Sequence, residues 1–472
     1  MGSVQTLDLE QLRARLSETA EIVTKDDSPP ELYQKSIARW SESSSIIIFP
    51  ATVEDVCVAV EYSAASGLEV AVVGGRHSTS GSSSSEGGIH IDLAKMRAVT
   101  VDPTNKTVTA QGGCRWEDVD TALANHQLAT VGGTVNDTGI GGLTLGGGYG
   151  HLMGQYGLVI DNLLEAEVVL ADGSVQKCSE SENEDLFWAI RGAGASFGVA
   201  TSLTYQAYDQ KNDTWAGLLF FPRERVRDVF TAANHLLDIG DGRCTLLPAY
   251  GTPPPSFEVI ILVAVFFNGP QEEAETFLEP LLSLNPFLNT TASVPYDNCN
   301  SLLNHVLGPG FRRSFKGSSI LVPVAVDFAE EILRDFEEFV ARVPDAKASV
   351  VIFEYFPYKK MMEVSQTSTA FANRGAIVGI ILAPGWTDPK NDSVCREWTR
   401  TMYAKTRADR LRKMSEGNVD SLTKTTVGEY MNHDGLGAGP KVLYGVNYDR
   451  LVELKKKYDP KRLFGNGPNS II

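Results

Sequence analysis

The chain has 472 residues, and at roughly 150 residues per domain this length predicts two or three domains. Hydrophobic residues make up 43% and charged residues 21%, a balance typical of globular proteins that excludes a disordered chain. The formal net charge of −17 argues against nucleic acid and anionic membranes, because both bind basic surfaces, and it favours a small, neutral molecule as the partner.

The N-terminus and the apolar runs predict a cytoplasmic protein. Asp8 and Glu10 stand where a secretory signal would carry a basic region. The longest apolar run, at 259–267, is shorter than the roughly 18 residues of a transmembrane helix and predicts a buried strand. We also expect reduced thiols and no metal site, because the cysteines lie far apart with no C-x-x-C pair. The six are Cys57, Cys114, Cys178, Cys244, Cys299 and Cys395.

The first predicted unit is a helix followed by a strand. Thr52 can cap a helix whose apolar residues recur at helical spacing, and Gly67 ends it. The run LEVAVV at 68–73 then predicts a strand, which delivers the sequence GGRHS at its end.

Shorter elements surround a glycine-rich segment, residues 138–150, in which seven of thirteen residues are glycine. Alternating apolar residues predict the strands, and helical spacing predicts the helices. In chain order these are strands at 89–93, 98–102 and 107–113, a helix at 116–127, a hairpin at 164–175 that turns at Asp172 and Gly173, and a helix at 183–192.

The pattern changes beyond about residue 214, where long strand-like runs alternate with amphipathic helices. This alternation predicts an α+β domain built on a largely antiparallel sheet. A last amphipathic helix at 449–460 is stopped by Pro460. The strand-like runs are at 215–221, 257–267, 349–356 and 376–383, and the helices are at 222–237 and 329–343.

The glycines of the two loops have two interpretations. They either make tight turns or let the backbone approach a phosphate closely. A Rossmann fingerprint fails, because Thr144 stands where the third glycine after Gly139 and Gly141 is needed, and Phe197 stands there after Gly192 and Gly194. The density of glycine therefore favours a nucleotide site of another type.

His77 alone indicates little. An isolated histidine in a loop is commonly a surface or hydrogen-bonding residue, and His77 has no partner at metal-ligand spacing. No G-x-S-x-G elbow is present, so a serine hydrolase is not supported.

Several long motifs carry a family resemblance. They are VVGGRHS, GGCRWEDVDTAL, TGIGGLTLGGGYGHLMGQYGLVIDNLLEAEVVLADGSV, NEDLFWAIRGAGASFGVAT and NYDRLVELKKKYDPKRLF, with TAFANR at 369–374 as a weaker echo. The chain resembles the berberine bridge enzyme-like oxidases and the 6-hydroxynicotine oxidases of the vanillyl-alcohol oxidase superfamily. This resemblance implies a two-domain α+β flavoprotein. Residues 1–213 and 425–472 would form the FAD-binding domain, and 214–424 would form a substrate domain whose antiparallel sheet covers the flavin ring.

The resemblance also gives His77 a role. In the family, the histidine of the G-G-R/G-H-S motif is bonded through a ring nitrogen to the 8α carbon of FAD, and a neutral imidazole, well populated near pH 7, suits that bond. FAD is thus the expected cofactor. The cofactor-binding residues that the motifs imply are Gly74, Gly75, Arg76, His77, Ser78, Gly81, Ser82, Thr138, Gly139, Gly141, Gly142, Gly146, Gly147, Gly148, Gly150, Val199 and Asn469.

One departure from the family concerns a second link to the flavin. Many relatives attach the flavin again through the cysteine of C-x-x-V/T-G-x-G-G-x-x-x-G-G-G, and Val135 occupies that position here. Valine has no thiol, so we expect a single covalent link, through His77.

The catalytic residues implied by the resemblance are Tyr430 and His433. The family carries Y-x-N-Y before the last helix, with a tyrosine that contacts the flavin or acts as base, and here the segment reads EYMNHDG. A turn could bring Tyr430 and His433 to the same side. As the base, His433 would make the rate of flavin reduction rise around a pKa of about 6 to 7. The alternative is that His433 is a substituted spacer.

The strand predicted at 349–356 offers further candidates. Glu354, Tyr355 and Tyr358 alternate with Phe353 and Phe356, so one subset could face the flavin ring, although a plain surface strand fits the pattern equally well.

The leading functional hypothesis is an FAD-dependent oxidase. It would remove a proton and a hydride from a small alcohol, amine or secondary-metabolite intermediate, and O₂ would reoxidise the flavin to give H₂O₂. The alternatives are a dehydrogenase with another electron acceptor, a redox-neutral cyclase or isomerase, and a flavin-binding protein without catalysis.

Overall fold

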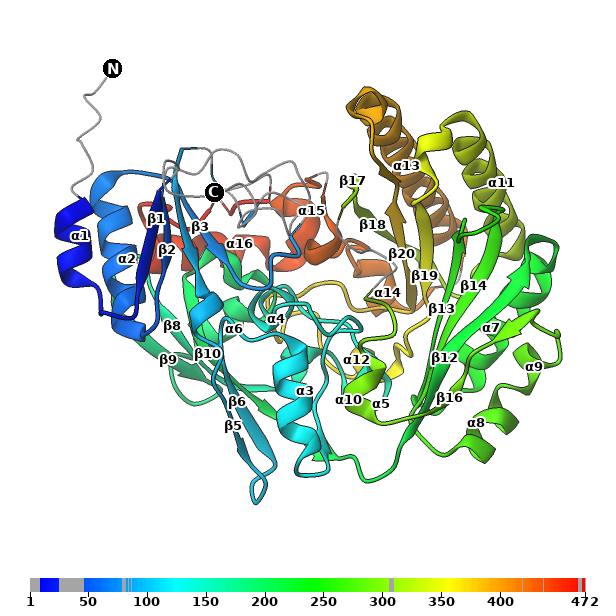
Figure 1. Ribbon diagram of the computed structural model, residues 1–472, viewed down its shortest axis with the longest axis horizontal. Coiled ribbons are helices and arrows are strands. Elements are labelled where there is room, and N and C mark those ends of the chain that lie inside the picture. Colours follow the sequence, from blue (N-terminus) through cyan, green and yellow to red (C-terminus); the bar gives the residue numbers. More distant parts are fainter. Residues whose placement is uncertain are drawn as a thin grey trace.

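The computed structural model describes residues 9–24, 46–78, 82–83, 85, 87–304, 310–417, 419–435, 437–465 and 469–471. Both ends of the chain, blue and red in Figure 1, lie in one half of the molecule, and the middle of the chain forms the other half. The fold is α+β with two main bodies, as the sequence predicts. The domain boundaries at 213/214 and 424/425 stay a prediction.

The first sheet carries the loop that contains His77. It has four strands in the order β1-β2-β4-β3; β2 and β3 each pair with β4 in parallel, and β1 pairs antiparallel with β2. Helix α2 begins and ends as predicted, because Thr52 and Asp55 form a capping box and Gly67 ends the helix at a φ of 66°. The bounds are α1 Leu9–Arg15, β1 Glu21–Thr24, β2 Ile46–Phe49, α2 Val53–Ser66, β3 Val70–Val73 and β4 Ile89–Asp92.

The second sheet is antiparallel, with five strands in the order β5-β6-β10-β8-β9. The hairpin of β8 and β9 turns at Gly173, whose φ of 82° confirms the predicted turn. Its strands are β5 Val99–Asp102, β6 Thr107–Gln111, β8 Leu163–Val169, β9 Val175–Ser179 and β10 Val199–Gln206, and β7 Leu128–Ala129 pairs with β11 Tyr208–Asp209. The helices around it are α3 Trp116–Ala124, α4 Ile140–Leu145, α5 Met153–Tyr156 and α6 Glu184–Ala193.

The C-terminal helices return to this half. The Lys455 ammonium, buried in α16, donates to the Ser196 carbonyl at 2.5 Å and to Asp459 at 2.7 Å, while Tyr458 donates to Asp185 of α6 at 2.6 Å. The contacts with Ser196 and Asp185 join chain segments 259 and 273 residues apart. The C-terminal elements are α14 Ser421–Thr425, α15 Pro440–Tyr444 and α16 Tyr448–Tyr458.

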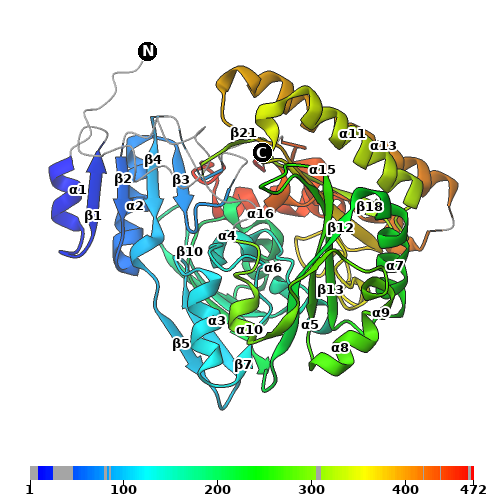
Figure 2. The same cartoon turned by 45° about the vertical axis from the view of Figure 1, so that its right-hand side comes forward.

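The middle of the chain forms an eight-stranded antiparallel sheet in the order β15-β12-β14-β13-β19-β20-β18, with β16 paired to β12. Figures 1 and 2 show α7, α11 and α13 on its outer side. The strands are β12 Thr214–Pro222, β13 Cys244–Gly251, β14 Ile260–Phe267, β15 Leu288–Asn289, β16 Ala292–Val294, β18 Lys316–Leu321, β19 Val350–Glu354 and β20 Ile377–Ala383, and β17 Arg312–Arg313 pairs with β21 Gly385–Trp386. The helices are α7 Val226–Ile239, α8 Gln271–Phe277, α9 Glu279–Leu282, α10 Tyr296–Cys299, α11 Val326–Arg342, α12 Lys359–Met362 and α13 Asp392–Glu416.

The two faces of this sheet belong to different cores, because side chains alternate along a strand. Leu246 and Phe267 pack with the outer helices, whereas Leu247 and Phe266 join the core of the N-terminal half. The sheet is therefore buried on both faces.

A buried ion pair ties the two bodies together. Arg374, the last residue of the TAFANR motif, is fully buried, and its guanidinium holds the Asp161 carboxylate with contacts of 2.6 and 3.0 Å. A bidentate pair of this kind fixes orientation as well as distance.

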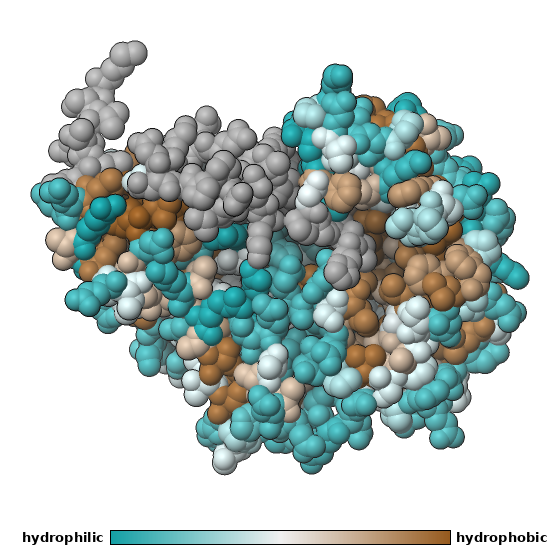
Figure 3. Space-filling view, viewed as in Figure 1, coloured by the Kyte–Doolittle hydropathy of each residue, from teal (hydrophilic) through white to brown (hydrophobic). Residues whose placement is uncertain are grey.

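The surface is mostly hydrophilic on the face in Figure 3, with apolar side chains gathered over β1 and β2 and over the large sheet. None of the helices in the described part of the chain is long and apolar enough to span a membrane. All six cysteines are free thiols, and only Cys57 is not fully buried.

Candidate active site

The loop that follows β3 is held in an unusual conformation. Arg76 has a φ of 62°, in the left-handed region that a non-glycine residue rarely adopts. Its guanidinium contacts the buried Asp92 carboxylate at 2.5 Å, which anchors the loop to β4. The loop also touches the glycine-rich segment, since a Cβ on Gly75 would lie 2.1 Å from the Gly139 nitrogen. Only glycine fits on either side of that contact.

His77 lies at the surface where these two segments meet. Its Nε2 is 2.9 Å from Asp137 Oδ1, and its Nδ1 is 3.5 Å from the Thr138 hydroxyl. The side chain is 42% exposed, so it is accessible to a large cofactor. Val135, at the position of the second flavin link in relatives, lies three residues before Thr138 and accepts a hydrogen bond from the Thr138 N–H.

Open backbone beside His77 fits a nucleotide cofactor. Gly142 is exposed, and a Cβ added there would meet nothing within 4 Å. Gly141 and Gly142 belong to the first turn of α4, whose N–H groups have no partners within the helix and can bind an anion. These residues fit the diphosphate of FAD.

Other predicted cofactor residues are placed differently. Gly146, Gly147 and Gly148 pack against the side chains of Asn432, Phe371 and Val159. The need for glycine at these three positions is therefore explained by protein packing.

The remaining residues predicted to bind the cofactor lie in different places. Ser82 forms a hydrogen bond with Ser78 on the same loop as His77, whereas Gly81 lies outside the described residues. Val199 is buried at the start of β10, and Gly150 packs on the Gly132 carbonyl. Asn469 contacts the segment that carries Tyr430 and His433, since it donates to Asp434 at 2.9 Å.

A second group of residues surrounds a small cavity between the large sheet and the glycine-rich segment. Its volume of about 20 Å³ has room for one water molecule. The lining combines residues of β18, β19 and β20 with Tyr430 and His433. The full set is Tyr149, Met153, Gly317, Ser318, Ser319, Glu354, Phe356, Tyr358, Met361, Asn373, Ile377, Gly379, Tyr430 and His433.

Tyr430 and His433 come together as the predicted turn requires. A 3₁₀ helix at Met431–His433 brings the two rings to a centroid distance of 4.7 Å. The Tyr430 hydroxyl accepts hydrogen bonds from the Gly148 N–H at 3.1 Å and from Asn432 at 2.8 Å. Burial raises the pKa of Tyr430, so the phenol stays protonated and accepts these donors as a neutral group.

Glu354 faces His433 across the cavity, with Oε2 3.7 Å from Nδ1 and 12% of its side chain exposed. Burial raises the pKa of Glu354 to about 8. Burial, with the nearby charge of Lys316, lowers the pKa of His433 to about 3. This value corrects the expected pKa of about 6 to 7, which assumed a solvated imidazole. His433 is therefore neutral at all ordinary pH values. Glu354 holds its proton more tightly than a solvated carboxyl group does.

The segment that runs from β19 to Tyr358 presents only part of the expected set to the cavity. Glu354, Phe356 and Tyr358 line it. Tyr355 instead points to the outer core, where its hydroxyl donates to Asn234 at 3.3 Å, because neighbouring residues of a strand face opposite sides. The grouping of Tyr355 with Glu354 was wrong.

A buried charged cluster, which we call the Lys316 cluster, lies behind His433. Lys316 contacts Asp434 at 2.5 Å and Glu429 at 3.1 Å, and Tyr403 donates to Glu429 at 2.9 Å. Arg410 lies 3.6 Å from Glu429. The cluster fixes both ends of the segment that carries Tyr430 and His433.

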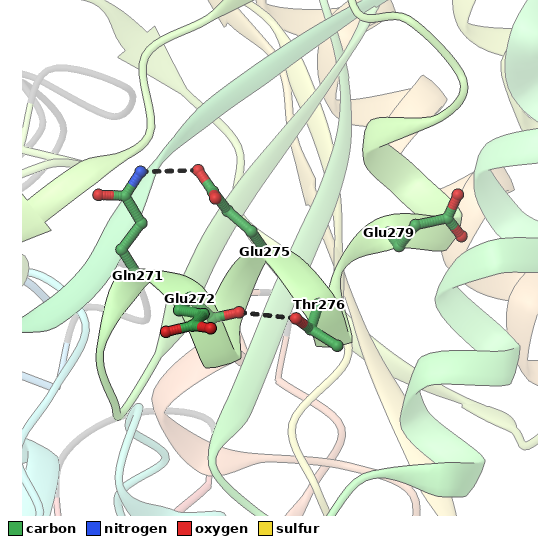
Figure 4. A pocket seen from close by; sticks show the side chains of 5 residues that line it. All are labelled: Gln271, Glu272, Glu275, Thr276 and Glu279. Carbon is green, nitrogen blue, oxygen red and sulfur yellow. Dashed lines mark hydrogen bonds between the residues drawn. The ribbon is translucent and has the colours of Figure 1, made fainter.

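A larger hollow lies far from these residues, over α8. It measures about 580 Å³ and is lined by Gln271, Glu272, Glu275, Thr276 and Glu279. Figure 4 shows that its hydrogen bonds run between neighbours on the same helix, from Gln271 to Glu275 and from Thr276 to the Glu272 carbonyl. No side chains converge there on a common point, so it is not the active site.

The sequence analysis missed three residues of the candidate active site. Asp137 lies two residues after Val135 in the flavin-attachment motif, and that spacing could have suggested it. Lys316 is the first residue of β18, whose sequence KGSSIL gave no signal that this lysine is buried. Tyr149, whose ring contacts Tyr430 at 4.7 Å, gave no signal among the surrounding glycines.

Comparison with known proteins identifies two segments. Residues 44–179 match a family model described as FAD binding domain, and residues 429–471 match one described as Berberine and berberine like. The chain is 35% identical over 472 residues to the FAD-linked oxidoreductase pgmH of Aspergillus terreus, which covers 97% of this chain and 95% of the relative. It is 27% identical to an FAD-linked oxidoreductase of Dictyostelium discoideum over 99% of both chains.

Solved structures share the fold along the whole chain. The 6-hydroxy-D-nicotine oxidase of Arthrobacter nicotinovorans superposes with a TM-score of 0.81 at 26% identity, over 96% of this chain and 98% of that one. Berberine bridge enzyme superposes with a TM-score of 0.83 at 17% identity, over 100% of this chain and 99% of that one, a likeness of fold alone.

Proposed function

Because the chain belongs to the berberine-like FAD-linked oxidoreductases, we propose that it is an oxidase that takes a hydride from a small organic substrate and passes the electrons to O₂. The substrate class is an alcohol, an amine or a secondary-metabolite intermediate. Bound FAD supplies the two-electron acceptor. The observation that carries the proposal is the pairing of Glu354 with His433 in an aromatic cavity next to the glycine-rich segment.

Glu354 is the proton acceptor in this proposal. Loss of a hydride from an alcohol or amine carbon is easier when its O–H or N–H proton leaves to a nearby base. The pKa of Glu354 is raised to about 8, so its ionised form is a stronger base than an ordinary carboxylate. His433, uncharged and 3.7 Å away, does not compete with that carboxylate for the proton.

The tyrosines hold and shape the cavity. Tyr149 stacks at 5.8 Å on Phe356, and its hydroxyl accepts from Asn373 at 3.2 Å. Tyr430 is fixed by Gly148 and Asn432. Because the cavity has room for one water molecule, a substrate needs side-chain movement to enter, and the aromatic walls then favour a flat, apolar substrate whose one polar group reaches Glu354.

Attachment of FAD through His77 alone is part of the proposal. His77 is exposed where the two glycine loops meet, and Val135 has no thiol for a second bond. The acid-precipitated protein should stay yellow, with a mass that exceeds the apo chain by one FAD. Proteolysis should give one flavin-linked peptide, containing His77, and a flavin-linked cysteine peptide would contradict the single link.

The reaction is tested by anaerobic bleaching of the flavin. A panel of alcohols, amines and phenolic or alkaloid-like compounds is mixed with the holoenzyme without oxygen, and air is then admitted. Bleaching by at least one class, recovery in air and one H₂O₂ per product formed support the oxidase. Bleaching that recovers only with an artificial acceptor would favour a dehydrogenase, and product formation without bleaching would favour a redox-neutral reaction.

A further inference from the structure

We propose that Asp137 prepares His77 for covalent attachment of the flavin, by orienting the imidazole and accepting its Nε2 proton. This inference rests on the proposed attachment at His77. The carrying observation is the contact of 2.9 Å between His77 Nε2 and Asp137 Oδ1.

The contact favours one tautomer of the histidine. It is a contact of distance only, since the pair does not meet hydrogen-bond geometry at Asp137 Oδ1. An ionised carboxylate has only acceptor atoms, so it favours a hydrogen on the ring nitrogen beside it. The hydrogen is then on Nε2, and Nδ1 carries the free electron pair. The Thr138 hydroxyl, 3.5 Å from Nδ1, is at the limit of hydrogen-bond distance and leaves that nitrogen able to react. The geometry thus points to a link through Nδ1.

Asp137 is held in place by the backbone on both sides. The Asn136 N–H donates to the Asn300 carbonyl at 2.8 Å, and the Trp116 N–H donates to the Thr138 carbonyl at 3.1 Å. The contact of Gly75 with Gly139 fixes the His77 loop against the same segment. The acid and the imidazole are therefore positioned before any cofactor binds, which lowers the entropy cost of the reaction.

A structural role alone does not account for the pair. The side chains of His77 and Asp137 are 42% and 46% exposed, and even a fully ionised pair with this exposure contributes at most about 1 kcal/mol to stability. A pair that contributes so little to folding, beside the residue that would form the covalent bond, is better explained by that bond.

The chemical step balances as follows. One C–H bond of the flavin 8-methyl group breaks, the C8α–Nδ1 bond forms, and the His77 Nε2–H bond breaks with its proton passing to Asp137. The electron pair of the broken C–H bond stays on the flavin, which ends two-electron reduced with two protons taken up. Dioxygen, the acceptor of the proposed reaction, then removes two electrons and two protons as H₂O₂ and restores the oxidised, attached flavin.

The experiment measures the rate at which flavin becomes covalently attached, and not the rate of turnover. Full-length protein from a riboflavin-auxotrophic host is supplied with FAD in air, and acid-stable flavin is measured over time by in-gel fluorescence and mass. Asp137→Asn keeps the shape and can still accept a hydrogen bond, but it cannot take the proton. We expect attachment to slow by about 10²-fold, the usual contribution of a general base, with noncovalent FAD binding unchanged.

Glu117→Gln is the matched control. It removes one negative charge near the same loop, but Glu117 pairs with Arg97 and Arg115 instead of His77. Attachment should proceed at the wild-type rate. Thermal unfolding of all variants checks that each is folded, and NMR of the wild-type flavin peptide gives the linked nitrogen.

Each outcome separates the two proposals. Wild-type protein that gains no acid-stable flavin would overturn the attachment at His77, and this inference with it. Wild-type attachment with an equal rate in Asp137→Asn would overturn the role of Asp137 alone. A wild-type link through Nε2 would do the same, because that nitrogen faces Asp137.

Discussion

The proposed attachment end of the site, around His77, and its proposed reaction end, around Glu354, are built in opposite ways. Around His77 the parts are backbone: glycines in contact, first-turn N–H groups of α4 and half-exposed side chains. Around Glu354 the parts are side chains from β18, β19, β20 and the Tyr430 segment, which together line one small cavity. The cofactor end thus depends on the absence of side chains, and the reaction end on their identity.

This difference teaches where substitutions act. At the attachment end, a single added methyl group should lower stability and slow flavin attachment. A change of charge at most positions there should have a mild effect. At the reaction end, the charge state of one carboxyl group should dominate. Three experiments can break or sharpen this contrast.

The largest effect is expected from Glu354→Gln. The variant keeps the shape but cannot accept a proton, so the anaerobic rate of flavin reduction should fall by about 10²- to 10⁴-fold. Stopped-flow absorbance measures that rate, while acid-stable flavin should remain at the wild-type amount. Glu363→Gln, an exposed carboxylate paired with Lys360, is the control and should change neither.

The same experiment has a pH dependence with a defined sign. Glu354 accepts a proton only when ionised, and its pKa is raised to about 8, so the wild-type rate should be low in acid and rise through about pH 8. The Gln variant should lose this rise. A wild-type midpoint between about 6 and 7 that persists in Glu354→Gln would instead return the base role to His433.

An intermediate effect is expected from one methyl group at the attachment end. In Gly75→Ala the new Cβ would lie 2.1 Å from the Gly139 nitrogen, whereas in Gly74→Ala it would lie 3.6 Å from its nearest neighbour, the Gly112 carbonyl. Overpacking of this kind typically costs about 1–3 kcal/mol. Gly75→Ala should lower the free energy of unfolding and slow flavin attachment, and Gly74→Ala should do neither. Equal behaviour of the two variants would contradict the close contact of the loops.

The smallest effect is expected from Tyr430→Phe. The change removes the acceptor of the Gly148 and Asn432 hydrogen bonds, a loss of about 1 kcal/mol in the free energy of unfolding. Chemical denaturation measures it, and a small shift of the flavin spectrum should accompany it. Tyr358→Phe, at a half-buried tyrosine of the same cavity, is the control. A 10²-fold fall in flavin reduction would show that the phenol takes part in proton transfer.

The sequence alone could predict the features that depend on near neighbours in the chain. Local rules placed the Thr52 cap, the Gly173 hairpin and the His77 loop correctly, because each depends on neighbours within a few residues. The turn that joins Tyr430 to His433 is also local.

The rest of the site depends on residues far apart in the chain. Lys316 meets Glu429 across 113 residues, and no local pattern specifies that contact. The low pKa of His433 follows from burial beneath the sheet and from the charge of Lys316, so the ordinary value of a solvated imidazole does not apply. Glu354 was a candidate by its alternation on a strand, but its partner emerged only from the packing of that strand against the Tyr430 segment.

The ion pair of Arg374 with Asp161 limits how the molecule can move. A hinge motion that lifts the large sheet would separate this buried pair and bring Leu247 and Phe266 into water. Exposing one such apolar side chain costs about 1.5–3 kcal/mol, so a fully open form is seldom populated. We therefore expect substrate to enter and product to leave through side-chain and loop fluctuations, and the two bodies to behave hydrodynamically as one particle throughout turnover.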